Sequence, residues 1–477
     1  MALIRARLSR VDQRLTDPGS DAGLTLIEVM FALMIFAIIS VSVAFSLTSS
    51  LVSTRDSKAR EVAANLAAQD IDNARSTSDV VSVRDKVFTQ TIDGIDYTVT
   101  RSTGWVTNAG ASSTCGLGGS GSLLYKHVNE WVTWTGARTS TTGVQSDTLI
   151  SSSGRLNDPT MGTIFVSVLS ANGAGVGGVT VSVSPADTNP NGATIPGTAP
   201  TLTDNDGCSY TFKASAGNYK VSISSLGGNY VSNTQLATVS KPNIQVTTGD
   251  STAVAFQYDL AGNFDVTYGS NGPAATVQFP TALPVNFVNS TGVFSPIVQI
   301  PPSKLLVQQL HPFASGYTIF TGGYTPPSAD TAGAPNPSCV SPDPQAWGPN
   351  SAGVRGHRQP AVATVPGGTV NVGVPMGIVT VTSPTNVYLT AVSAQADASV
   401  GDPGCSSSLG MSYSFGTVTS ATSTAIALPF GTWQLYSGSS MGSLSTIVPS
   451  SAVSLPAGSP SNTGSGVFTL DPRVIAP

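Results

Sequence analysis

Glu28 is the residue of this sequence whose chemical type most needs an explanation. It is the one charged side chain in an apolar run from Leu24 to Leu47. A carboxylate inside a membrane helix costs up to about 3 kcal/mol on insertion, so intramembrane acidic residues are retained where they have a function. The position of Glu28 within this run therefore indicates that its charge has a function.

Two other patterns carry less chemical weight. Gly438–Gly442 has the Gly-x-Ser-x-Gly order of a hydrolase nucleophile, but a Ser-rich segment follows it and every histidine of the chain precedes it. Asp204–Gly207 starts like a calcium loop, but Cys208 stands where an oxygen ligand is needed, which favours an Asx turn. The cysteines are too far apart in sequence for a zinc site. We therefore expect no enzyme activity, no metal and no cofactor.

The apolar run is long enough for a membrane helix. Its residues would extend about 36 Å as a helix, and the hydrocarbon core of a bilayer is about 30 Å thick. Four arginines precede the run: Arg5, Arg7, Arg10 and Arg14. They favour a cytoplasmic leader and export of the rest, although a second cationic cluster at Arg55 to Arg60 weakens this bias. We expect a single-pass membrane protein with its C-terminal region outside the cell.

The segment Gly23–Val29, GLTLIEV, followed by the apolar helix, resembles the N-terminus of the type IV prepilin family, which includes the pseudopilins of type II secretion. The resemblance implies cleavage between Gly23 and Leu24 by a prepilin peptidase, N-methylation of Leu24, and other pilin subunits as partners. Leu24 departs from the phenylalanine or methionine common at this position. Glu28 would then pair with the N-terminal amine of a neighbouring subunit in a filament. A plain signal anchor is the alternative.

The pattern after the membrane run predicts a pilin-like head. Apolar residues continue at three- and four-residue spacing: Ala59, Val62, Ala63, Leu66, Ala67, Ile71 and Ala74. No Gly or Pro interrupts residues 24–78, so one long helix follows the leader of residues 1–23. Strands are expected in the head, residues 79–154, at residues 87–92, 95–101, 123–134 and 144–151. Asp93-Gly94 is a strong hairpin signal between the first two of these strands.

The remainder of the chain is rich in Gly, Ser, Thr and Val and reads as short strands. Two glycine-led patterns recur three times at nearly constant offset: Gly162 with Gly217, Gly262 with Gly316, and Gly377 with Gly431. They predict three β-sandwich modules, at residues 161–260, 261–375 and 376–477. The first module resembles carboxypeptidase-regulatory-like and Cna-B-like sandwich domains in residues 177–183, 203–212 and 217–221. The expected fold class is α+β, a long helix with a small antiparallel sheet followed by tandem Ig-like or transthyretin-like sandwiches.

Composition fits an exported surface protein. Charged residues make up 10% of the chain and the net charge is −5, so no basic face indicates nucleic-acid binding. The four cysteines, Cys115, Cys208, Cys339 and Cys405, all follow the membrane run. An even number in an oxidising compartment predicts two disulfides, and we favour the pair Cys339 with Cys405 while the sequence leaves three connectivities open.

These features together predict a minor type IV pilin. The additional modules would crowd the lattice of a major pilin, so the chain is expected in few copies, displaying the modules for adhesion, binding of a surface or wall ligand, or filament initiation. Two alternatives remain: a pseudopilin of a type II secretion or DNA-uptake machine, and an uncleaved membrane-anchored adhesin.

Overall fold

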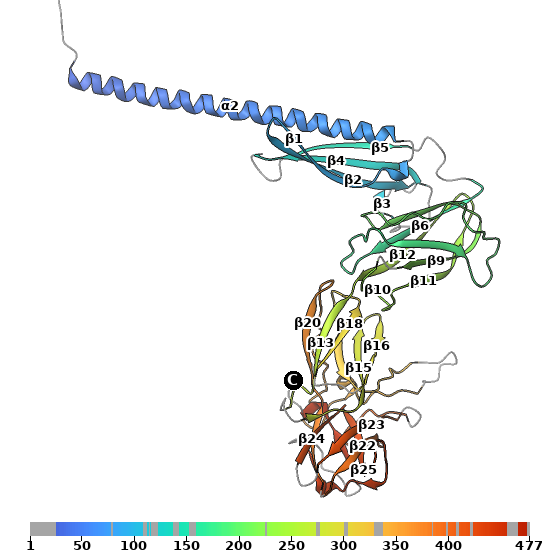
Figure 1. Ribbon diagram of the computed structural model, residues 1–477. Helices are drawn as coiled ribbons and strands as arrows, with labels where there is room; N and C mark the ends of the chain where they lie inside the picture. Colours follow the sequence, from blue (N-terminus) through green and yellow to red (C-terminus); the bar gives the residue numbers. More distant parts are fainter. Residues whose placement is uncertain are drawn as a thin grey trace, which may run out of the picture. The chain divides into compact units, whose positions relative to one another are not determined.

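Figure 1 shows the computed structural model of the chain. It describes residues 25–77, 80–107, 112–113, 115, 123–136, 143–151, 159–224, 227–272, 277–299, 304–328, 337–383, 385–396, 399–406, 410–419, 423–455 and 466–474. One long helix precedes a series of mostly antiparallel sheets, which confirms the predicted α+β class with sandwich modules. The chain divides into two compact units, one of residues 1–102 and 128–149 and one of residues 103–127 and 150–477.

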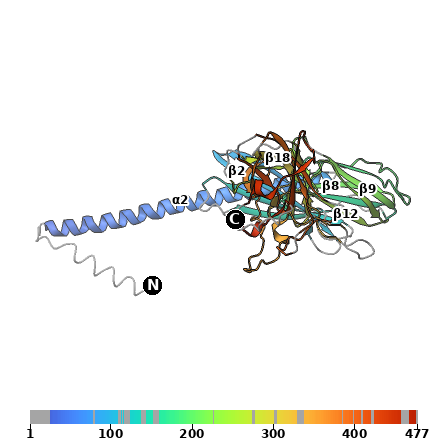
Figure 2. The ribbon, with the colours of Figure 1, turned by 90° about the horizontal axis from the view of Figure 1, so that it is seen from below.

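Helix α2, Leu26–Ser76, runs without a break for 51 residues, about 76 Å at 1.5 Å per residue (Figures 1 and 2). Strong helix formers such as Ala, Leu and Met fill it, and neither Gly nor Pro interrupts it. Its second half carries the buried face that the apolar spacing predicts. The buried side chains are Ala59, Ala63, Leu66, Ala67, Asp70, Ile71 and Ala74.

A sheet of order β1-β2-β4-β5 packs on this half of α2, with β3 paired to β2. The strands are β1 Lys86–Ile92, β2 Ile95–Thr107, β3 Ser112–Ser113, β4 Leu123–Trp134 and β5 Gly143–Ile150, after a 3-10 turn η2 at Val80–Ser82. The predicted hairpin has the expected turn: Asp93 and Gly94 both have positive φ, 52° and 75°. Tyr97, Val99 and Trp134 join the buried face of the helix in one core.

Residues 162–260 form a sandwich of two sheets, here called the first sandwich, with orders β10-β12-β6-β8 and β11-β9-β7. Its strands are β6 Gly162–Leu169, β7 Thr180–Pro185, β8 Cys208–Ala214, β9 Gly217–Ser224, β10 Tyr230–Ser232, β11 Val239–Val246 and β12 Ser251–Leu260. The two sheets close on an aliphatic and aromatic core that includes Ile164, Tyr219 and Phe256. Its first and last strands, β6 and β12, are parallel neighbours.

Residues 262–374, here called the second β region, begin one residue after β12. The strands are β13 Gly262–Tyr268, β14 Val277–Gln278, β15 Ala282–Asn289, β16 Gly292–Phe294, β17 Ile297–Gln299, β18 Lys304–Leu310, β19 Thr318–Thr321 and β20 Thr369–Val374, with a 3-10 turn η3 at Pro344–Ala346. β13 pairs with β18 and, in parallel, with β20, while β15 pairs with β16, β17 and β19.

Residues 377–470, here called the third β region, follow after two residues. The strands are β21 Gly377–Thr382, β22 Val387–Ser393, β23 Ser412–Val418, β24 Ser423–Leu428, β25 Gly431–Gly438, β26 Thr446–Ile447, β27 Val453–Ser454 and β28 Val467–Leu470, with 3-10 turns η5 at Ser450–Ala452 and η6 at Pro472–Val474. One sheet has the order β14-β24-β21-β27 and therefore takes β14 from the second β region; the other is β23-β22-β25-β26 with β28 on β25. Both regions contribute to one continuous hydrophobic cluster.

Candidate functional site

The first half of α2 presents an unpartnered apolar surface. Every residue from 25 to 55 is exposed, including large side chains such as Leu26 at 81%, Phe36 at 68% and Phe45 at 73%. Water does not stabilise so much apolar area, so the surface requires lipid or other protein around it. By length and hydropathy α2 is able to cross a membrane.

Hydroxyl side chains within this half form hydrogen bonds with backbone carbonyls of the same helix. The hydroxyls of Ser42, Thr48 and Thr54 each donate to the carbonyl oxygen four residues earlier, at 2.8 Å. A hydroxyl bonded in this way enters hydrocarbon without an unpaired donor. The Ser and Thr residues therefore fit a membrane-spanning or filament-buried helix.

Glu28 lies in the first turn of α2 and is exposed. Its backbone N–H donates to the carbonyl of Thr25 at 3.0 Å, so the turn is closed at this point. A negative side chain is favoured at a helix N-terminus by the helix dipole, but no described residue supplies a charge partner for it. The predicted cleavage and methylation positions, Gly23 and Leu24, lie outside the described residues, so the Glu28–amine pair stays a prediction.

A buried ionic cluster joins the second half of α2 to the sheet. Arg101 on β2 donates from Nε to Glu130 Oε1 on β4 at 2.9 Å, and from Nη2 to the side chain and backbone oxygen of Asp70 on α2. All three residues are at most 9% exposed. The guanidinium therefore bridges two carboxylates in a site of low dielectric, and removing it would leave both charges unpaired.

The two carboxylates share a single cation, which changes the protonation of Glu130. Its Oε2 atom is buried, and no described residue forms a hydrogen bond with it by geometry. Burial, together with the neighbouring Asp70, raises the pKa of Glu130 to about 7, against the opposing effect of Arg101. Glu130 therefore becomes negatively charged only as the pH rises through its pKa of about 7.

Sequence reasoning missed this cluster. Asp70 lies on the buried side of α2, in step with Ala63 and Ala67, although polar residues were expected on the opposite face. Glu130 likewise falls between the buried Val128 and Val132 in the alternation of β4. Charged residues at core-facing positions of a periodic pattern were the available signal.

The four cysteines form two disulfides, Cys115–Cys208 and Cys339–Cys405. The second is the pair that the sequence analysis favoured. Cys115 lies between β3 and β4 and Cys208 begins β8, so the first bridge lies within the second compact unit and joins the segment between β3 and β4 to the first sandwich. Cys339 precedes η3 and Cys405 lies between β22 and β23, so the second bridge ties the second β region to the third.

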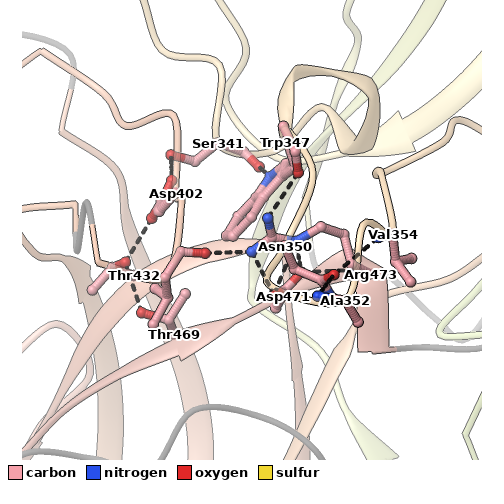
Figure 3. A network of polar contacts seen from close by, with 12 residues as sticks. Ser341, Trp347, Asn350, Ala352, Val354, Asp402, Thr432, Thr469, Asp471 and Arg473 are labelled. Carbon is pink, nitrogen blue, oxygen red and sulfur yellow. Dashed lines mark hydrogen bonds and ion pairs between the residues drawn. The ribbon is translucent and has the colours of Figure 1, made fainter.

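Beside the second disulfide, a buried polar network holds the ends of several loops (Figure 3). Asp402 accepts hydrogen bonds from the hydroxyls of Ser341, at 2.5 Å, and Thr432, at 2.6 Å, and Thr432 contacts Thr469 at 3.0 Å. Its carboxylate also accepts the backbone N–H of Gly404 at 2.9 Å. Its oxygens thus accept hydrogen bonds from hydroxyl and backbone donors, as buried polar atoms generally do.

Arg473, the middle residue of η6, completes the same region. Its guanidinium pairs with Asp471 at 2.7–3.1 Å and donates to the carbonyls of Gly348, at 2.8 Å, and Val400. It also lies over the ring of Trp347, 5.2 Å from its centroid. Side chains from the segment before β20 and from the chain's last turn are thereby locked together, which is a structural role.

The weaker chemical patterns have local structural functions. Asp204 accepts the backbone N–H groups of Asp206 and Cys208, at 3.1 and 2.8 Å, as an Asx turn does. Gly438 ends β25. A bend and turn at residues 439–442 and then the short strand β26 follow it, whereas a nucleophile turn leads into an α-helix. Trp134 packs in the core beneath α2, while Trp131 lies half-buried beside Gly143.

Comparison with known families supports the N-terminal assignment. Residues 19–44 match the model of the prokaryotic N-terminal methylation motif. The N-terminal segment is therefore similar to those that carry this methylation motif. The match covers residues 19–44 and ends inside α2, so it says nothing about the rest of the helix or the β regions.

Comparison with curated proteins finds no match. Among solved structures, the Bacillus anthracis TIE protein aligns over 82% of this chain and 71% of that chain, at 12% identity and a TM-score of 0.19. A Streptococcal ancillary pilin aligns over 52% of this chain and 75% of that chain, also at 12% identity and a TM-score of 0.19. Likeness at this TM-score carries no argument about this chain.

Proposed function

We propose that this chain is a minor type IV pilin, cleaved after Gly23, N-methylated on Leu24 and assembled into a filament through α2. The methylation motif at residues 19–44 carries the proposal, because it coincides with an apolar half-helix on which nothing else in the described chain packs. The prepilin peptidase and neighbouring pilin subunits are the partners that this motif implies.

The mechanism follows from the two halves of α2. The first half rests in the membrane before assembly and among neighbouring helices afterwards, so both environments cover its apolar surface. In the filament, Glu28 neutralises the amine of Leu24 from an adjacent subunit, which removes two unpaired charges from low dielectric. The second half stays fixed to its own sheet through the Ala63–Leu66 face and the Arg101 cluster.

The remaining regions give the subunit its second role. We assign three modules, residues 161–260, 261–375 and 376–477, which lie outside the cell and are displayed by the filament for adhesion, binding to a surface or wall ligand, or filament initiation. Their combined size favours a subunit present in few copies. The first module keeps its proposed relation to carboxypeptidase-regulatory-like and Cna-B-like domains, which are scaffolds without an activity of their own.

The deciding experiment is intact-mass analysis and N-terminal sequencing of the chain from its native host, in membrane and sheared-filament fractions. We expect a chain that begins at methylated Leu24 in both fractions. Gly23→Val should retain the leader and be lost from filaments, while Gly19→Val, the same change four residues earlier, should be processed normally.

Other outcomes identify the competing functions. A mature chain that starts at Met1 would refute the proposal and support an anchored adhesin. Correct processing without any chain in sheared pili, together with a defect in protein secretion or DNA uptake on deletion, would support a pseudopilin instead.

A further inference from the structure

His311 lies at the joint between the first sandwich and the second β region. One residue, Ala261, separates β12 from β13 at this joint, and neither disulfide spans it. Its geometry therefore depends on non-covalent contacts. They include contacts of β10 and the turn after it with the segment after β18.

A closed cycle of hydrogen bonds connects the two sides. The backbone N–H of His311 donates to Gln235 Oε1 at 2.7 Å, and Gln235 Nε2 donates to the Tyr317 hydroxyl at 2.9 Å. That hydroxyl donates in turn to the carbonyl of His311 at 2.7 Å. Gln235 has a positive φ of 65°, which is uncommon for a residue other than glycine, so the turn that carries it has an unusual backbone conformation.

The ring of His311 adds a third hydrogen bond across the joint, beside the two that Gln235 forms. It is fully buried, and Nδ1 lies 3.2 Å from the carbonyl oxygen of Val231 on β10. A carbonyl only accepts, so Nδ1 carries the proton and Nε2 is the unprotonated nitrogen. Nε2 is buried and has no hydrogen-bond partner among the described residues, and the ring packs edge-on against Phe313 with 4.6 Å between the ring centroids.

Adding a second proton to this ring is unfavourable in the closed joint. It would create a buried cation whose Nε2–H has no acceptor. Burial lowers the pKa of His311, against smaller opposing effects of the Val231 carbonyl and of Asp259. Asp259 on β12 already accepts the backbone N–H groups of Ala171 and Leu260, and burial raises the pKa of Tyr317, which stays neutral.

We propose that this joint is an acid-released hinge, which fixes the first sandwich to the second β region at neutral pH and frees them when His311 takes up a proton. The sign follows from the two states. A released His311 has an ordinary pKa of about 6.5, above that of the closed joint, so the released state binds more protons. Closure is fully favoured above about pH 6.5 and is lost as the pH falls below it.

Pulsed dipolar EPR on the full chain in detergent tests this inference. All four native cysteines are paired, so spin labels on Thr248→Cys and Ser270→Cys react alone, at exposed positions on either side of the joint. We expect one narrow distance distribution at pH 7.5 and a broad one at pH 5.0. Over this interval the ratio of released to closed joints should rise by up to about thirtyfold.

Three variants separate titration from simple packing. His311→Asn keeps a donor where Nδ1 lies but does not titrate, so its distribution should stay narrow at both pH values. His357→Asn changes an exposed histidine, and its distance distribution should respond to pH as that of the parent does.

Gln235→Leu breaks the hydrogen-bond cycle, so its distance distribution should be broad at both pH values. Equal widths in the parent at the two pH values, or broadening of His311→Asn at pH 5.0, would overturn the proposal. Failure of filament assembly would leave this test unaffected.

Discussion

Glu130 is buried against α2 with one oxygen unpaired, and that position links its protonation to the stability of the head. Its pKa in the folded head is about 7, above the ordinary value for glutamate of about 4.3. Its favourable contribution is therefore fully present below about pH 4.3 and lost as the pH rises through 7. The protein retains the cluster although an apolar trio would avoid this loss.

Glu130→Gln should remove the titration while keeping the acceptor for Arg101. We expect the variant to gain stability over the parent by roughly 1–3 kcal/mol at pH 8 and to match it within about 1 kcal/mol at pH 4.5. Denaturant unfolding at a series of pH values, followed by the near-ultraviolet signal of the head tryptophans, measures the difference. A constant offset across pH would show that Glu130 does not titrate in this range.

Glu28→Gln should spare membrane insertion and impair assembly, because it removes the charge but keeps the size. We expect at least a tenfold loss of the chain from sheared filaments with unchanged membrane content. Glu61→Gln, an exposed glutamate on the second half of the same helix, should assemble normally. Immunoblots of the two fractions give the ratio, and undiminished Glu28→Gln in filaments would remove the charge-pairing function.

At the scale of elements, local patterns predicted most of what positions the site. The unbroken helix, the turn at Asp93 and Gly94, and strands beginning at Gly162, Gly262 and Gly377 all follow from spacing or turn chemistry. The pairings between strands that are distant in sequence could not be predicted from such local patterns. The parallel contacts of β6 with β12, and of β13 with β20, join residues that no local periodicity connects.

The same limit explains what was missed at the site. The cluster at Arg101 requires three elements to meet, and the cycle at His311 requires a turn and a strand end that are about 75 residues apart. In each case the polar residue types were visible in the sequence, but their partners were set by tertiary packing. The Asx turn at Asp204 was predictable because its partners are within four residues.

The interface between α2 and its sheet should be sensitive to cavity formation. Leu66 is 6% exposed within the core that contains Tyr97 and Trp134, so Leu66→Ala should cost about 2–4 kcal/mol. Gln69→Ala, on the exposed side of the same turn, should change stability by less than about 0.5 kcal/mol. Thermal unfolding of both variants at one pH checks the contrast.

For the whole molecule, the disulfide Cys115–Cys208 should hold the chain together across a cut. A protease site placed at the exposed Ile195, between β7 and β8, lies inside the closed loop. After cleavage the two pieces should migrate as one on a non-reducing gel and separate on a reducing gel. The same site at the exposed Leu236 lies outside both loops and should give two pieces in either gel. Separation of the Ile195 pieces without reductant would contradict the pairing.

The two disulfides also determine which parts of the chain carry mechanical load. When the C-terminal end is pulled away from an anchored α2, tension crosses the sulfur–sulfur bonds instead of the backbone between them. The loops they close span sequence separations of 93 and 66 residues, roughly 320 and 220 Å of extended chain. Oxidation thus makes the region after α2 a shorter and stiffer tether, and reduction would release that slack.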